Sequence, residues 1–167
     1  MKNKFLSIIF ILPLLTISQT FVSTIPENKN IILEEFTGIS CGYCPDGHKI
    51  AKDLKDQYPN DVFLINIHSG SYASPQGAGT DFRTSFGTSI STQSGTCGYP
   101  AGTVNRRNFT SQGWNQTSSN CTATTAMSRG NWSQAAQLLL SENSPVNIGV
   151  QANVNMSTRL LTVDVEV

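Results

Sequence analysis

The sequence predicts an α/β fold, and three observations support this prediction. Two short apolar segments, 31–36 and 62–67, flank a stretch with helical spacing, which is the pattern of a β-α-β unit. A long insertion rich in glycine, serine and threonine, 69–96, follows them. After residue 145, alternating apolar and polar residues indicate a hairpin. We therefore expect an α/β domain over 27–143 and, over 145–167, the first hairpin of a truncated, β-rich and sandwich-like domain.

The N-terminal segment, residues 1–23, has the layout of a secretory signal peptide. Lys2 and Lys4 precede an apolar run over 5–17, and small polar residues follow it. A membrane-spanning helix needs about 20 apolar residues, so we expect the mature chain to have no integral membrane span. The predicted location is the periplasm or the cell surface, including an association with the outer membrane. In such an oxidising compartment the 4 cysteines predict disulfides rather than structural zinc.

The composition limits both the size of the fold and the class of partner. A chain of 167 residues with 38% hydrophobic residues is long enough for one cored domain and part of another. Its 11 basic and 11 acidic residues leave no formal net charge. Because binding to phosphates requires clustered lysine and arginine, this balance argues against a nucleic-acid-binding protein.

The β-α-β unit opens with the apolar segment 31–36, which predicts a buried strand. A helix is expected over 45–58, because apolar residues recur there at helical spacing and a proline stands in its first turn, where it is tolerated. The segment 62–67 predicts a second buried strand. This order of elements requires parallel strands joined by a right-handed crossover.

The rest of the chain gives weaker structural signals. Within the insertion, residues 81–86 predict a short helix, and 102–106 predict a short strand. The polar segment 110–125 is expected to be a loop, so that no antiparallel strand follows Val104. A further helix is predicted over 131–141.

The hairpin predicted at the end of the chain has apolar residues at alternate positions on both sides of a turn within 153–158. One face is therefore apolar. An isolated hairpin is only marginally stable in water, and the alternation still continues at Val167. We expect the β-rich domain to extend beyond this residue.

The strongest chemical signal is a Cys-Gly-Tyr-Cys motif between the first strand and the first helix. At a helix N-terminus, free N–H groups and the helix dipole stabilise a thiolate. We therefore expect Cys41 to be the nucleophile and Cys44 to be the resolving thiol of a disulfide exchange. Two alternatives remain open, namely a purely structural disulfide and a zinc site that includes His48.

The region from the first strand to this motif resembles the active-site region of thioredoxins. The resemblance implies that Glu35, six residues before the first cysteine, is a buried carboxylate that assists proton transfer. It also implies that Pro100 is the cis-proline that packs against the cysteine pair and holds an extended substrate segment, with Tyr99 beside it. A carboxylate facing water is the alternative for Glu35, and a packing residue is the alternative for Tyr99.

A closer resemblance is to the bacterial family named as related to a 28 kDa outer membrane protein. It is carried by Glu-Phe-Thr-Gly with Cys-Gly-Tyr-Cys-Pro, by Ile-Asn-Ile-His-Ser-Gly, and by Tyr-Pro-Ala-Gly-Thr-Val-Asn-Arg. These motifs imply a thioredoxin-like core in the α/β domain. The implied partners are protein thiols and disulfides, with no cofactor and no metal.

Three residues outside the motif complete the set of candidate site residues. Cys97 and Cys121 are expected to form a structural disulfide that ties the polar loop to the strand before it; in the alternative, Cys97 exchanges with the motif cysteines. His68 ends the second strand, on the side where α/β sheets place their sites, so it either lines the site or has a capping or solvent-facing role.

Two functional hypotheses follow from the sequence. In the first, the chain is an exported thiol–disulfide oxidoreductase that uses Cys41 and Cys44. In the second, it is a non-enzymatic module at the cell surface, in which the thioredoxin-like fold is a scaffold and the β-rich domain binds the partner.

Overall fold

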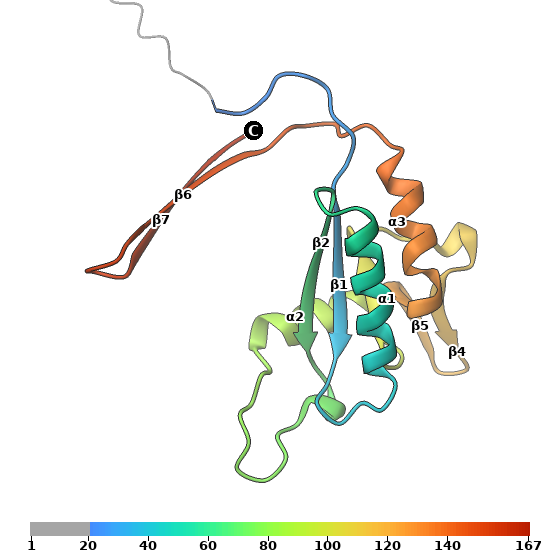
Figure 1. The fold of residues 1–167 in the computed structure, drawn as a ribbon. Helices are drawn as coiled ribbons and strands as arrows, with labels where there is room; N and C mark the ends of the chain where they lie inside the picture. Colours follow the sequence, from blue (N-terminus) through green and yellow to red (C-terminus); the bar gives the residue numbers. More distant parts are fainter. Residues whose placement is uncertain (1–20) are drawn as a thin grey trace, which may run out of the picture. The chain divides into compact units, whose positions relative to one another are not determined.

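The computed structural model describes residues 21–167 and divides the chain into two compact units. The first unit is Glu27–Pro145, and the second contains the described residues 21–26 and the segment 146–167 (Figure 1). The predicted signal peptide, except for its last three residues, lies outside the described residues. Across 21–167, no helix has the length and apolar character needed to cross a membrane.

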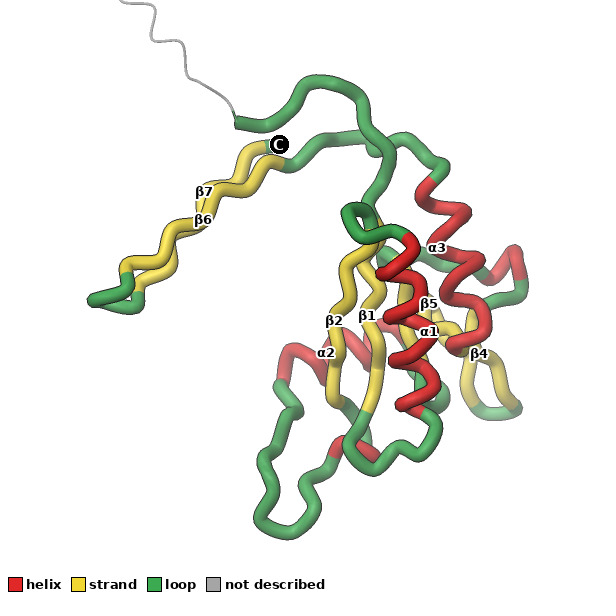
Figure 2. Tube along the Cα trace, viewed as in Figure 1, coloured by secondary structure: helices red, strands yellow, loops and turns green. Residues whose placement is uncertain are grey.

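The first unit is a mixed α/β structure, with a five-stranded sheet in the order β2-β1-β3-β5-β4 and helices on both of its faces (Figures 1 and 2). Its strands and α-helices are β1 (Ile31–Thr37), α1 (Cys44–Gln57), β2 (Val62–His68), α2 (Ser85–Ser94), β3 (Ala101–Val104), β4 (Asn115–Ser118), β5 (Cys121–Ser128) and α3 (Trp132–Leu140). The α/β class predicted from the sequence is confirmed.

The predicted β-α-β unit is present, with both strands parallel. β1 and β2 pair in register from Ile31 with Val62 to Thr37 with His68. β3 then lies antiparallel along the other side of β1, with Phe36 opposite Ala101. Strand β1 therefore lies inside the sheet, with a hydrogen-bonded neighbour on each side.

The core has two layers, one on each face of the sheet. On one face, α1 and α3 cover Ile31 and Leu33 of β1, and Trp132 is the largest side chain that is fully buried there. On the other face, α2 contributes Ile90, which packs against Phe36 and the neighbouring strands. The two layers explain why β1 is buried on both of its faces.

Strand β2 is less buried than the sequence predicts. It is an edge strand, and Phe63 and Ile65 keep 46% and 45% of their surface exposed. Helix α2 packs near the end of this strand, where Ile67 belongs to the core, and leaves the first half uncovered on that face. The apolar composition of 62–67 therefore predicted a strand correctly, but it did not show that this strand lies at the edge of the sheet.

The prediction of a loop over 110–125 is wrong. This segment contains β4 and the start of β5, which pair with each other as an antiparallel hairpin, and β5 also pairs antiparallel with β3. An antiparallel strand does therefore follow Val104. The strand was missed because its buried positions hold small residues, such as Ala123 and Ala126, among threonines.

The helix predicted over 81–86 begins later than expected. Helix α2 starts at Ser85, and the side chain of Thr84 caps it by accepting a hydrogen bond from the N–H of Gly87 at 2.9 Å. Gly95 ends it in the left-handed conformation, with φ of 66°. The bulky residues at 82 and 86 suggested the helix, but the capping threonine sets where it starts.

The second unit contains the predicted hairpin, formed by β6 (Gly149–Asn155) and β7 (Leu160–Glu166). The alternation brings apolar residues opposite one another on one face of the hairpin, in the cross-strand pairs Val150–Val165, Ala152–Val163 and Val154–Leu161. All six of these side chains are exposed. The hairpin thus carries an apolar face that the described residues do not cover.

Candidate functional site

The Cys-Gly-Tyr-Cys motif occupies the turn between β1 and α1. The N–H of Cys41 donates to the carbonyl of Gly38 at 3.1 Å, and the N–H of Cys44 donates to the carbonyl of Cys41 at 3.2 Å. The turn needs glycine at 38, because a Cβ there would lie 2.3 Å from the backbone of Tyr72. This geometry brings the cysteines together, and they are joined by a disulfide with a sequence separation of 3.

The two cysteines differ in how far they reach the surface. Cys41 is 8% exposed, whereas Cys44, the first residue of α1, is 2% exposed. Between them, Gly42 faces open space and Tyr43 is 71% exposed. A partner that approaches the disulfide therefore meets Cys41 more readily than Cys44.

The N-terminus of α1 provides the electrostatic setting of the disulfide. No side chain caps this helix of 14 residues, and Pro45 has no N–H to donate. Asp46 adds a negative charge to the first turn, but the guanidinium of Arg129 binds it at 2.5 Å and also lies over the ring of Tyr43, with 5.7 Å to the centroid. The helix dipole is thus available to a thiolate, and the nearest acidic charge has a partner.

Glu35 is buried in strand β1, so the structure shows the buried alternative and not the water-facing one. Only 2% of the residue is exposed. Its Oε2 lies 3.0 Å from Nδ1 of His48 on α1, and Nε2 of His48 lies 3.2 Å from Oγ1 of Thr37. Burial raises the pKa of Glu35, and the charge and hydrogen bond of His48 offset only part of this increase.

His48 is the residue of this site that the sequence reasoning treated only as a zinc ligand. It lies one helical turn after Cys44, which places the two side chains on one face of α1. That spacing was the available signal, but the contact with Glu35 depends on which face of the helix meets β1. Among residues 21–167, no group of three or more histidine, cysteine or acidic residues is arranged to hold a metal ion.

Pro100 lies between strand β3 and helix α1. The Tyr99–Pro100 peptide bond is cis, and Pro100 is buried immediately before β3. Its ring contacts α1 closely: a Cβ on Gly47 would lie 3.2 Å from Pro100 and 3.3 Å from Trp132. The proline therefore packs against the first turns of the helix that begins with Cys44.

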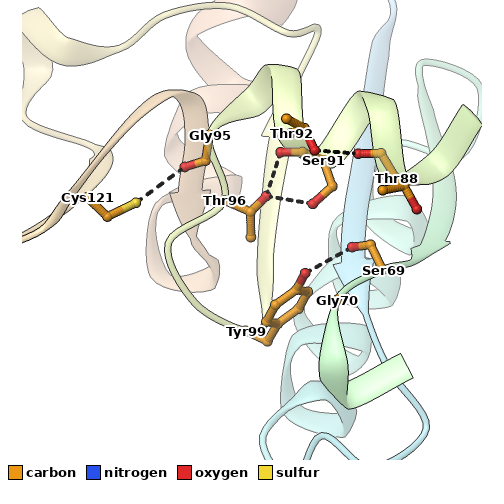
Figure 3. A pocket seen from close by; sticks show the side chains of 9 residues that line it. All are labelled: Ser69, Gly70, Thr88, Ser91, Thr92, Gly95, Thr96, Tyr99 and Cys121. Atoms are coloured by element: carbon orange, nitrogen blue, oxygen red, sulfur yellow. Dashed lines mark hydrogen bonds between the residues drawn. The ribbon is translucent and has the colours of Figure 1, made fainter. Parts of the chain in front are cut away.

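Tyr99 connects the site to a cavity of about 380 Å³ on the α2 side (Figure 3). Its hydroxyl lies 3.1 Å from that of Ser69, and its ring meets the ring of Tyr72 edge-on, with centroids 5.8 Å apart. The other side chains around the cavity are mostly hydroxyls of α2, namely Thr88, Ser91 and Thr92. The structure thus places Tyr99 beside Tyr72 and at a cavity whose lining carries several hydroxyls and no charged group.

His68 lines a different cavity, also of about 380 Å³. There it lies beside Phe82, with ring centroids 5.3 Å apart, and near the ion pair of Glu34 with Arg106. Within the described residues, its Nδ1 is buried and has no hydrogen-bond partner. Neither cysteine of the motif lines this cavity, so the structure does not bring His68 together with them there.

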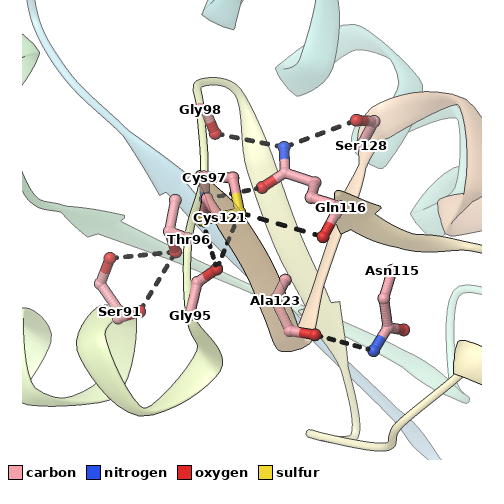
Figure 4. Close-up of a disulfide and its surroundings, with 10 residues drawn as sticks. All are labelled: Ser91, Gly95, Thr96, Cys97, Gly98, Asn115, Gln116, Cys121, Ala123 and Ser128. Carbon is pink, nitrogen blue, oxygen red and sulfur yellow. Dashed lines mark hydrogen bonds between the residues drawn. A yellow bond between two sulfur atoms is a disulfide. The ribbon is translucent and has the colours of Figure 1, made fainter. Parts of the chain in front are cut away.

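A second disulfide joins Cys97, between α2 and β3, to Cys121 at the start of β5 (Figure 4). Gln116 supports this connection from β4: its side-chain oxygen accepts from the N–H of Cys97 at 3.0 Å, and its amide donates to the carbonyl of Gly98 at 3.3 Å. The pairing is the one expected from the sequence. It fastens the end of the insertion to the sheet.

Comparisons of the chain with protein-family models, curated proteins and solved structures found no match.

Proposed function

We propose that this chain is a thioredoxin-like thiol–disulfide oxidoreductase that acts on extracytoplasmic proteins, and that it belongs with the bacterial family named as related to a 28 kDa outer membrane protein. The observation that carries the proposal is the Cys41–Cys44 disulfide at the N-terminus of α1, directly after a strand buried inside the sheet. This is the setting in which a cysteine becomes a stabilised thiolate.

The proposed reaction has two steps. The thiolate of Cys41 attacks a substrate disulfide, forms a mixed disulfide and releases one substrate thiolate. Cys44 then gives up its proton and attacks the sulfur of Cys41, which releases the second substrate thiolate and forms the Cys41–Cys44 bond. The enzyme pair loses two electrons and the substrate disulfide gains them. In the reverse direction the same steps oxidise a substrate dithiol.

The difference in exposure between the cysteines supports this assignment of roles. The more exposed Cys41 can reach a partner, whereas the more buried Cys44 is suited to attack within the molecule. Glu35 is the proposed acceptor of the Cys44 proton, because it is buried on the strand that α1 packs against and hydrogen-bonds to His48 on that helix. A base positioned in this way speeds proton transfer in many enzymes.

The arrangement of the first unit supports the proposed relationship to thioredoxins. Parallel β1 and β2 flank α1, antiparallel β3 follows Pro100, and β5 adds another antiparallel strand. The two disulfides support an oxidising compartment. We propose that Pro100 and Tyr99 bound the groove that receives the substrate segment.

The test is the reduction potential of the Cys41–Cys44 pair, measured by thiol trapping after equilibration in glutathione and dithiothreitol buffers. An exchange-active pair should be reduced at a potential above about −300 mV, while the Cys97–Cys121 bond stays intact. A Cys97→Ser/Cys121→Ser variant identifies which pair titrates. A Cys41–Cys44 pair that stays oxidised below about −300 mV would refute the enzyme proposal and favour the non-enzymatic surface module.

A further inference from the structure

The buried carboxylate of Glu35 needs a route by which its proton leaves. In the proposed reaction, Glu35 receives a proton when Cys44 attacks, so a proton that the carboxylate already holds must leave before that attack. Its side chain is only 3% exposed, so water has almost no direct access to the carboxylate. The side chain of His48, which is 40% exposed, is hydrogen-bonded to it. His48 thus contacts both the buried carboxylate and the solvent.

We infer that His48 is the positioning residue that passes protons from Glu35 to solvent, so that Glu35 can accept the proton of Cys44. This inference rests on the proposed function. Three observations support it, namely the 3.0 Å contact with Glu35, the 3.2 Å contact with Thr37, and the position of His48 one helical turn after Cys44. Within residues 21–167, no other side chain hydrogen-bonds to the carboxylate of Glu35.

The hydrogen bonds around His48 are compatible with the movement of this proton. When Glu35 is protonated, it can donate to Nδ1 of His48, whose Nε2–H donates to the hydroxyl of Thr37. When the proton has moved to Nδ1, the imidazolium donates to the Glu35 carboxylate, and the bond to Thr37 is unchanged. The transfer therefore moves one proton between two atoms and breaks neither contact. The imidazolium then releases a proton to water, so that His48 is neutral again and the proton from Glu35 is accounted for.

Few other titratable groups flank this pair. The register partners of Glu35 and Thr37 on β2 are Asn66 and His68. On α1, Lys52 lies one turn beyond His48 and is paired with Asp56 at the surface. Of these, His68 is the only other histidine of the chain, and its ring contacts Phe82 instead.

The experiment separates the two steps in the reduced protein with one equivalent of an aromatic disulfide that releases a coloured thiolate. The first release of thiolate reports the attack of Cys41, and its rate depends on the concentrations of the protein and the disulfide. The second release reports the attack of Cys44 within the molecule, and its rate does not depend on these concentrations. In His48→Asn, we expect the first step to stay within about twofold and the second to slow by about tenfold or more near neutral pH, since asparagine can hydrogen-bond to Glu35 but cannot carry the proton.

Two further variants show whether His48 acts through its proton. In His48→Ala, added imidazole should restore much of the second step without changing the first, an effect that a purely structural role would not produce. The control Lys52→Gln, one turn along the same helix, should leave both steps unchanged. A second step within about twofold of the wild type in both His48 variants would overturn the inference, as would equal effects of imidazole on wild type and variant.

The outcomes for the inference and for the proposed function are distinguishable. A wild-type protein without a second step would refute the exchange function itself, whereas a wild type with both steps and unaffected His48 variants would refute only the role of His48. If both His48 variants also lose the first step, the inference is tested on the wild-type protein, by comparing the two rates in water and in deuterium oxide. Its second step should slow more than its first in deuterium oxide, and equal slowing of both steps would overturn the inference.

Discussion

At the scale of single residues, the burial of Glu35 makes the stability of the folded protein depend on pH. Its pKa is raised, mainly by burial, so the folded protein holds the proton at pH values where the unfolded chain has lost it. The folded state is therefore disfavoured as the pH rises from the usual carboxylate range to the raised value. Above that window, the full destabilisation by the buried charge remains.

The variant Glu35→Gln should change stability and activity in opposite directions. Near neutral pH, we expect it to unfold at higher denaturant concentrations than the wild type, because the buried charge is absent, and this gain should disappear below about pH 4. The second step of exchange should slow by about a hundredfold. Urea unfolding between these pH values checks the first effect. Equal stability of both proteins at every pH would contradict it.

Gly47 illustrates a second constraint on single residues. In an exposed helix, a change to alanine would stabilise by about 1 kcal/mol. Here the new Cβ would meet Pro100 and Trp132 at 3.2 and 3.3 Å, and both neighbours are buried. Because overpacking costs about 1–3 kcal/mol, we expect Gly47→Ala to destabilise by about 1 kcal/mol and to slow exchange.

The matched control is Gly42→Ala, because a Cβ at position 42 would meet no atom within 4 Å. Thermal unfolding should place this variant close to the wild type. A Gly47→Ala protein that is more stable than the wild type would mean that Pro100 and Trp132 can move apart easily.

The sequence could predict the cysteines and the candidate carboxylate, but not the whole of their environment. Glu35 remained ambiguous because an acidic residue in a strand can face either water or the core. The position of β1 inside the sheet decides this, and strand order cannot be read from local composition. His48 was missed as the partner of Glu35 for the same reason, since the contact joins two elements whose packing the sequence does not state.

At the scale of elements, the ion pair of Arg129 with Asp46 protects the N-terminus of α1 from an unpaired negative charge. We expect Arg129→Gln to lower the rate at which Cys41 is alkylated below neutral pH by about two- to fivefold, because a free Asp46 disfavours the thiolate. The variant Asp46→Asn should have the opposite effect. The alkylation rate as a function of pH measures both, and no difference between the two variants would show that the ion pair does not influence the thiolate.

The second disulfide acts on the connection between α2 and β5. It has a sequence separation of 24, compared with 3 for Cys41–Cys44. In the chain-entropy model, closing the longer loop stabilises by roughly 3.5 kcal/mol and the shorter loop by less. The variant Cys97→Ser/Cys121→Ser should therefore lower the free energy of unfolding more than the motif double serine variant does.

Guanidinium unfolding of the two variants provides the comparison, with exchange activity as a control. The protein without the Cys97–Cys121 bond should still reduce substrate disulfides. Loss of exchange in that variant, with the fold intact, would instead favour the alternative in which Cys97 exchanges with the motif cysteines.

The elements that could be predicted are those with a strong periodic signal. The strand–helix–strand unit has apolar runs and a clear helical face, and it was found as expected. The β4–β5 hairpin was not, because threonine, serine and alanine give little contrast between its two faces. The sheet holds these polar strands through pairing with β3, which is a tertiary interaction.

At the scale of the whole molecule, the described chain contains one unit with a core and one without. The second unit leaves the apolar side chains of its hairpin exposed. We expect the protein to bind a hydrophobic dye through this face. Replacing one cross-strand pair, Val150→Thr with Val165→Thr, should lower dye binding by about a third, because it is one of 3 such pairs.

The control for that experiment is Gln151→Thr, which changes the opposite face of the same strand. It should leave dye binding unchanged. None of these substitutions should alter the unfolding midpoint of Glu27–Pro145. Unchanged dye binding in the valine variant would indicate that another surface attracts the dye.

The packing of Trp132 has a consequence for how this protein can be observed. It is one of 2 tryptophans, it is fully buried, and its ring lies against the backbone of Gly47 on the helix that begins with Cys44. Movement of that helix would change the surroundings of the ring and, with them, its emission. The molecule therefore contains a buried intrinsic fluorophore packed against the helix that carries its candidate redox centre, and its emission reports on that helix in solution without any added label.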